Sequence, residues 1–111
     1  MNMMISYQEL VRTFPSLVKQ SRGFSNKPLF ITEIGWSTAS SNKGVSEKSQ
    51  SQFITNAICD AKKIGISAVI IYQIRDGLPN NSHPTEPGFG IYKYNWDEKP
   101  IISSLKSKGC W

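Results

Sequence analysis

The sequence of 111 residues lacks several features that would place it in a class at once. It has no run of about 18 apolar residues, so we expect no transmembrane helix and no membrane partner. The apolar segment Met1–Ile5 is too short for a signal peptide and lacks a basic n-region. As written, we expect the product to remain in the cytoplasm.

Cysteine and histidine are scarce, with two cysteines and one histidine in the chain. Cys59 and Cys110 have no C-x-x-C spacing and no cluster of histidines beside them, so the sequence predicts no metal site and no cofactor. Cys59 falls on the apolar face of a predicted helix, where we expect a small buried side chain. A disulfide with Cys110 is left open.

Basic residues outnumber acidic ones, giving a formal net charge of +5, but they do not cluster. A nucleic-acid interface would need a basic patch with aromatic side chains between the charges. The scattered lysines and arginines are typical of a solvated surface. We therefore expect no nucleic-acid partner.

Apolar periodicity and capping residues predict alternating helices and strands. The expected elements are a helix opening at Ser6 with apolar positions Leu10, Val11, Phe14, Leu17 and Val18, a strand Leu29–Ile34, a helix from the N-cap Ser46 to Gly65, a strand Ile66–Ile74, a loop Asp76–Gly88, a short strand or hairpin over Gly90–Lys99, and a helix Ile101–Lys108 after Pro100. This order predicts an α/β fold with parallel strands.

The segment Ile66–Ile74 is almost continuously apolar and β-branched, which is typical of a parallel strand buried on both faces. Such strands need neighbours on each edge, and this chain offers two strong strands and a weak third. The pattern fits roughly the last quarter to two-fifths of a (β/α)8 barrel. A compact three-strand α/β domain that closes on itself is the alternative.

Glu33 lies at the carboxyl end of the first predicted strand, immediately before Ile34-Gly35. A carboxylate in an apolar strand needs partners or a function, and this end of parallel strands carries the chemistry of α/β enzymes. By alternation, Leu29, Ile31 and Glu33 share a face, so Glu33 points into a barrel mouth if the other two fill the barrel interior. Otherwise Glu33 is structural, paired with Arg75 or capping a helix.

Four segments, taken in their order, carry a resemblance to a known group of enzymes. The segment Lys27–Thr38, with its core Thr-Glu-Ile-Gly-Trp, is similar to the seventh-strand motif of retaining glycoside hydrolases on (β/α)8 barrels (clan A). Val45–Gln52 resembles the start of the seventh helix of that fold, Val69–Asp76 resembles its eighth strand, and Glu86–Ile91 with Glu98–Pro100 resembles its closing segment. The similarity is greatest to families five and thirty-nine, and less to family seventeen.

The resemblance implies that residues 1–111 form part of a TIM-barrel glycosidase domain, strands 7 and 8 with flanking helices, without its N-terminal half. It implies that Glu33 is the catalytic nucleophile and that a saccharide is the substrate of the parent enzyme in carbohydrate metabolism. The acid/base residue of this clan lies at the end of the fourth strand, in a part that this chain lacks. Glu86 is a weak substitute, since a solvated loop residue is the simpler interpretation. Asp76 is expected to order the loop, with Arg75 as its candidate partner.

Three further side chains are candidate substrate contacts. Trp36 either stacks on a sugar or packs against the following helix. Tyr72 either binds Glu33 or sugar, or is a buried tyrosine with a satisfied hydroxyl, and Gln73 faces the site. Many clan members carry a tryptophan at the end of the eighth strand, where this sequence has Ile70-Ile71-Tyr72.

Three functions therefore compete. The first is a retaining β-glycosidase fragment that is inactive alone, whose parent, like many members of the clan, is a candidate for secretion. The second is a non-catalytic carbohydrate-binding or interaction module. The third is a non-functional truncated product.

Overall fold

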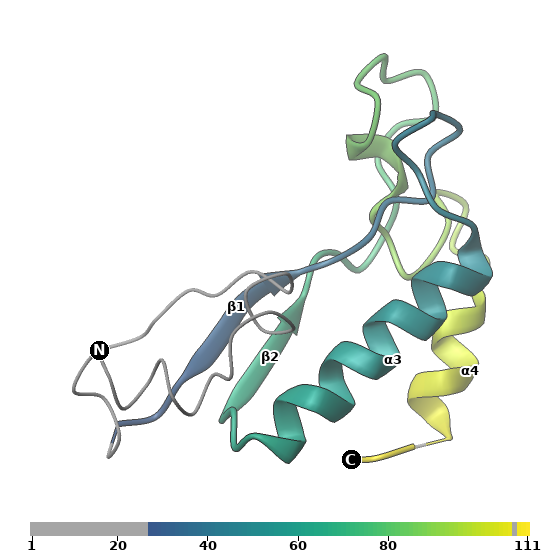
Figure 1. Ribbon diagram of the computed structural model, residues 1–111. Coiled ribbons are helices and arrows are strands. Elements are labelled where there is room, and N and C mark those ends of the chain that lie inside the picture. The colour runs from purple at the N-terminus through teal and green to yellow at the C-terminus, as the bar shows by residue number, and fades with distance from the viewer. Residues whose placement is uncertain (1–26, 108) are drawn as a thin grey trace.

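The computed structural model describes residues 27–107 and 109–111. Its elements, in chain order, are strand β1 (Phe30–Ile34), helix α3 (Glu47–Lys63), strand β2 (Ala68–Ile71), the 3-10 turn η1 (Glu86–Gly88) and helix α4 (Pro100–Lys106). Figure 1 shows the two strands side by side, α3 along them and α4 beyond α3. The helix expected from Ser6 lies outside the described residues.

The two strands form a parallel sheet, as the sequence predicts. Phe30 pairs with Ala68 and Ile31 with Val69, and the next pair is Ile34 with Ile71. Three steps along β1 thus match two steps along β2, so β1 carries one extra residue. A bulge of this kind locally reverses which face a side chain occupies.

Helix α3 connects the strands and is bounded by the residues that the sequence indicates. The Ser46 hydroxyl accepts a hydrogen bond from the Ser49 amide at 3.0 Å, which satisfies a free donor of the first turn. Gly65 follows the helix with φ of +80°, a conformation that glycine adopts without steric cost. The Ile66 amide then bonds to the Ala61 carbonyl at 2.9 Å, closing a Schellman-type end.

The core lies between α3 and one face of the sheet. Its buried members are Leu29, Ile31, Ile34, Ala57 and Ala61. The two alanines allow the helix backbone to approach the strands closely. This packing makes β1, α3 and β2 one β–α–β unit, to which α4 adds the buried side chains Ile101 and Ile102.

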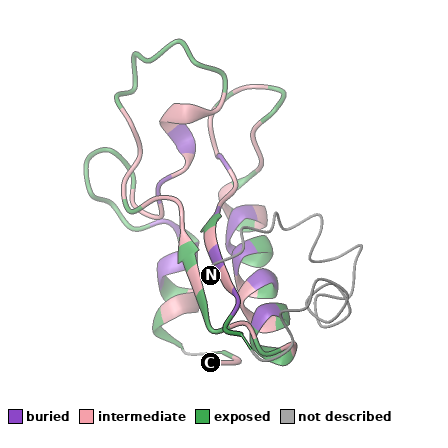
Figure 2. Cartoon of the chain, turned by 90° about the vertical axis from the view of Figure 1, so that its left-hand side faces the viewer, coloured by how far each residue is buried: buried purple, intermediate pink, exposed green. Residues whose placement is uncertain are grey.

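The prediction of a second strand buried on both faces is wrong for the described structure. The strand has four residues, where nine were expected. Val69 and Ile71 pack against the core, whereas Ile70, on the opposite face, is 57% exposed. Figure 2 shows exposed stretches beside buried and half-buried ones along the strands. A helix covers one face only, so alternate residues remain open to solvent.

The expected hairpin near the C-terminus appears as two isolated bridges, because Tyr92 pairs with both Arg75 and Glu98. The last helix begins at Pro100, as the sequence indicates, and ends at Lys106. No described helix has the length and hydropathy needed to cross a membrane.

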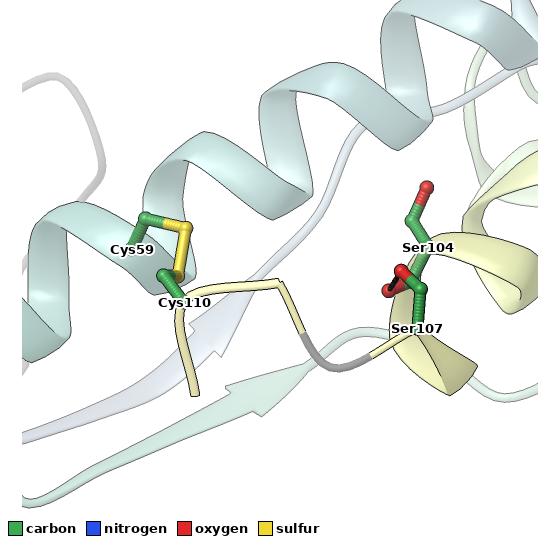
Figure 3. The surroundings of a disulfide bond; sticks show 4 residues. All are labelled: Cys59, Ser104, Ser107 and Cys110. Carbon is green, nitrogen blue, oxygen red and sulfur yellow. Dashed lines mark hydrogen bonds between the residues drawn. A yellow bond between two sulfur atoms is a disulfide. The ribbon is translucent and has the colours of Figure 1, made fainter.

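Cys59 and Cys110 form a disulfide, with their Cα atoms 5.4 Å apart (Figure 3). The disulfide that the sequence left open is present, and Cys59 is half-buried where a fully buried side chain was expected. The cysteine lies on a half-buried flank of α3, not on the face that packs against the sheet. The bond attaches the C-terminal residues to α3, which sequence spacing alone did not decide.

Candidate active site

The loops that follow the two strands meet at the carboxyl ends of the strands (Figure 1). The Thr38 amide donates to the Gly88 carbonyl at 2.9 Å, which joins the loop after β1 to η1. The Gln73 amide donates to the Phe89 carbonyl at 3.1 Å, which joins the end of β2 to the segment after η1. Parallel strands place their functional side chains at this edge.

A buried lysine holds these loops together. Lys99 is 2% exposed, and its ammonium group bonds to Asp76 Oδ1 at 2.7 Å, to Thr38 Oγ1 at 2.8 Å and to the Gly88 carbonyl at 3.2 Å. Asp76 Oδ1 also accepts from the Gly90 amide at 2.8 Å. Asp76 thus orders the loop, as expected, but through Lys99 and not through Arg75. No sequence pattern indicates this pairing, because an isolated lysine is ordinarily a surface residue.

Glu33 is exposed at the end of β1 and forms no ion pair with a described lysine or arginine. The alternation argument for its direction is wrong, because Leu29 and Ile31 face α3 and do not fill a barrel interior. The bulge places Ile34, not Glu33, on the helix side with Ile31. The Glu33 carboxylate therefore lies on the face of the sheet opposite α3 because of the bulge, and not because of alternation with Leu29 and Ile31.

Tyr72 follows β2 directly and lies across from the end of β1. Its amide donates to the Ile34 carbonyl at 2.8 Å. A Cβ on Gly35 would lie 2.1 Å from the Tyr72 carbonyl oxygen, so the approach of the two segments requires glycine at position 35. The Tyr72 hydroxyl donates its one proton to Glu86 Oε2 at 3.2 Å. Tyr72 therefore binds a loop carboxylate here and does not donate to Glu33.

Two carboxylates act on the Tyr72 hydroxyl. The negative charge of Glu86 and the hydrogen bond to it raise the pKa of Tyr72 above its ordinary value, with smaller contributions from burial and from the charge of Glu33. Both charges disfavour the phenolate. Of the two carboxylates, Glu86 is the one hydrogen-bonded to the hydroxyl, and Glu33 contributes the smaller effect on the pKa of Tyr72.

The sequence suggested that Glu86 is a solvated loop residue, but the structure places it differently. It opens η1 and is half-buried, and its amide donates to His83 Nδ1 at 3.1 Å. The Thr85 amide donates to the same nitrogen at 3.3 Å. His83 thus caps this turn from the loop.

Trp36 packs against Phe53 of α3, with ring centroids 5.5 Å apart. This is the packing alternative of the two that the sequence left open. The Trp36 carbonyl accepts from the buried side chain of Gln50 at 3.0 Å, so α3 positions the backbone just after Glu33. A role of Trp36 in sugar binding stays a prediction.

Gln73 is half-buried, and its backbone pairs with Phe89 and Ile91 beside Tyr72. Its contact with substrate also stays a prediction. Arg75 does not pair with Glu33, because its guanidinium lies over the rings of Tyr94 and Trp96, 4.3 and 4.9 Å from their centroids. Among the described residues, no group of three or more histidine, cysteine and acidic side chains is placed to hold a metal ion.

Two surface grooves of about 450 Å³ each lie among these loops, and Glu33 and Tyr72 line neither of them. Both grooves include Thr38, Asp76 and Pro87. Glu33 is exposed at the end of β1 and lies outside both grooves.

No protein-family model and no curated protein matches this sequence. Solved structures do match its fold. A family 39 glycoside hydrolase from Bacteroides cellulosilyticus WH2 has a TM-score of 0.66 and 17% identity over 87% of this chain and 20% of its own. A family 17 β-1,3-glucanosyltransferase from Rhizomucor miehei has a TM-score of 0.63 and 22% identity over 90% and 41%. A family 2 β-galacturonidase from Eisenbergiella tayi has a TM-score of 0.67 and 19% identity over 96% and 22%.

These similarities show the fold and no more, because every identity given is below 25%. The chain has the α/β fold found in glycoside hydrolases of the TIM-barrel type. It spans between one fifth and two fifths of the length of these three structures. The three belong to different families, so the fold does not choose among families five, thirty-nine and seventeen.

Proposed function

We propose that residues 1–111 are the C-terminal part of a retaining glycoside hydrolase domain on a (β/α)8 barrel, with β1 and β2 as its seventh and eighth strands. The observation that carries this is Glu33, an exposed carboxylate at the carboxyl end of a parallel strand that a bulge turns away from the helix-covered face. The partial coverage of the three glycoside hydrolases supports it.

In this proposal Glu33 is the nucleophile. Retaining hydrolysis uses two carboxyl groups roughly 5 Å apart, one of which attacks the anomeric carbon while the other protonates the leaving oxygen. The attack forms a glycosyl ester on Glu33, and water activated by the second group then cleaves it. The second carboxyl group belongs to the fourth strand of the barrel. The sugar cleft belongs in large part to the same missing half, which agrees with the exposure of Glu33 outside both grooves.

The chain alone is therefore expected to have no turnover on aryl β-glycosides or soluble β-glucans. The test expresses it joined to the in-frame coding sequence upstream, where we expect a strand that ends in Asn-Glu. Turnover by the joined protein should fall at least about 10³-fold in Glu33→Gln, since the nucleophile is lost. Glu98→Gln, which removes an exposed carboxylate ion-paired with Lys106, is the control and should leave turnover unchanged.

Three results would contradict parts of this proposal. Turnover by the chain alone that Glu33→Gln abolishes would show that no further strands are needed. Turnover of the joined protein that survives Glu33→Gln would remove Glu33 as the nucleophile. A stop codon upstream with no such strand would favour a non-functional product, and saccharide binding without turnover would favour a binding module.

A further inference from the structure

The described chain fixes a second carboxylate at the same end of the sheet as Glu33. Glu86 Oε2 accepts the Tyr72 hydroxyl proton at 3.2 Å, and the Glu86 amide donates to His83 Nδ1 at 3.1 Å. Side chain and backbone of Glu86 are thus both anchored. The hydrogen bond uses one carboxylate oxygen, and Oε1 keeps its capacity to accept from another donor.

The turn that carries Glu86 is itself fixed to the loop after β1. The Ser37 hydroxyl donates to the Thr85 carbonyl, and the Thr38 amide donates to the Gly88 carbonyl at 2.9 Å. Phe89 packs edge-on against the Tyr72 ring, with centroids 5.4 Å apart. Glu86 therefore has a defined position beside Tyr72.

The charges near this hydroxyl are negative. Glu86 and Glu33 both disfavour the phenolate of Tyr72, and no described cation contributes a compensating effect. Two of the cations in the surrounding loops bind elsewhere. Lys99 is buried with Asp76, and Arg75 is stacked on Tyr94 and Trp96.

From this arrangement we infer that Glu86, held by Tyr72, is a specificity-determining residue that selects a neutral glycone over a hexuronate. The inference rests on the proposed function, because it assumes that sugar binds at Glu33. A carboxylate accepts strong hydrogen bonds from sugar hydroxyls. The carboxylate of a uronic acid would instead face two like charges, which repel it. The fold does not decide this, since a β-galacturonidase shares it.

The test compares methyl β-glucoside with methyl β-glucuronide, which differ only in the group at carbon 6. Binding to the joined protein, which in the proposed function includes the rest of the sugar cleft, is followed by NMR through the amides of Glu33, Tyr72, Glu86 and Phe89, at low salt and neutral pH. The chain has a formal net charge of +5, which by itself favours the anion. We expect the glucoside to bind at least about tenfold more tightly, so the local carboxylates must outweigh this charge.

Glu86→Gln should reduce this preference to less than about threefold, because it removes one of the two charges and keeps the shape. Glu98→Gln removes the same charge at an exposed site that is paired with Lys106, and should leave the preference intact. Tyr72→Phe keeps the charge of Glu86 but frees its side chain, and should reduce the preference partway. Dispersed NMR spectra verify that each variant is folded.

The inference would be overturned by any one of four results. These are equal affinities, tighter binding of the glucuronide, an unchanged preference in Glu86→Gln, and no chemical-shift changes with either sugar. Its failure can be separated from failure of the proposed function. Glu33-dependent turnover by the joined protein without a preference for the glucoside defeats only the specificity. A preference for the glucoside without turnover defeats only the catalytic assignment.

Discussion

The two faces of the β1–β2 sheet differ sharply in how they are satisfied. On the face toward α3, Ile31 is fully buried and Ile34 is 5% exposed. On the other face, Ile70 is 57% exposed, and Glu33 is open to solvent at the strand end. The face covered by α3 contains the buried core. The other face has the candidate nucleophile Glu33 and exposed apolar side chains such as Ile70, whose contact with water is unfavourable.

This difference is what a piece of a barrel would show. In a complete (β/α)8 barrel the outer face packs on helices, and the inner face packs on side chains from the other strands. The described chain supplies its own outer layer in α3. In such a barrel Ile70 would take an interior position, whose neighbours are not among the described residues.

The largest expected effect contrasts one isoleucine from each face. Ile31→Ala should lower the free energy of unfolding by about 2–5 kcal/mol, because it removes buried apolar atoms and leaves a cavity in the core. Ile70→Ala should change it by less than about 0.5 kcal/mol, as at other exposed positions. Urea unfolding followed by circular dichroism measures both. Equal losses would mean that the second face is covered in solution.

A smaller effect is expected from the disulfide, which fastens the C-terminus to α3 and so supports the helix-covered side. Cys110→Ser should lower the free energy of unfolding by roughly 2–4 kcal/mol, because the unfolded chain is no longer constrained by a cross-link between residues 51 positions apart. The measurement is urea unfolding with and without a reductant. Under reducing conditions, the free energy of unfolding of the wild type should equal that of the variant. A wild-type free energy of unfolding that does not change with the reductant would contradict the presence of the disulfide.

The smallest effect concerns the carboxylates of the open side. Tyr72 should titrate above the ordinary value of about 10, because Glu86 and Glu33 disfavour its phenolate. Since the folded pKa is the higher one, the stability linked to Tyr72 is present below pH about 10 and is lost as the pH rises through the folded pKa.

NMR of the tyrosine ring carbons measures this titration. Glu86→Gln should move the Tyr72 transition to lower pH, whereas Glu98→Gln should not. A Tyr72 transition that is the same in wild type and Glu86→Gln would contradict the hydrogen bond, and with it the basis of the specificity inference.

Much of the local structure could be predicted from the sequence. Ser46 and Gly65 mark the ends of α3 because capping and positive φ are properties of single residues. The first strand was found to within one residue. The extent of the second was not, since the apolar run predicts burial by neighbours that the described residues do not provide.

The site was predicted less well. Glu33 was found from its position in the chain, but its direction depends on a bulge that the amino-acid sequence did not reveal. The partners of Tyr72, Asp76 and Arg75 were missed or misassigned, because they lie 14 to 23 residues away along the chain or are stacked across a loop. Pairings at such separations depend on how loops fold back, which no local pattern encodes.

The sequence by itself determined the α/β order, the parallel strands and an acidic residue at a strand end, because each follows from local propensity and apolar periodicity. Only the tertiary structure decided which face of the sheet is covered, that Lys99 is buried against Asp76, and that Glu86 joins Tyr72 beside Glu33. These depend on contacts between distant segments, where the removal of apolar surface from water and the pairing of buried charges select one arrangement among many.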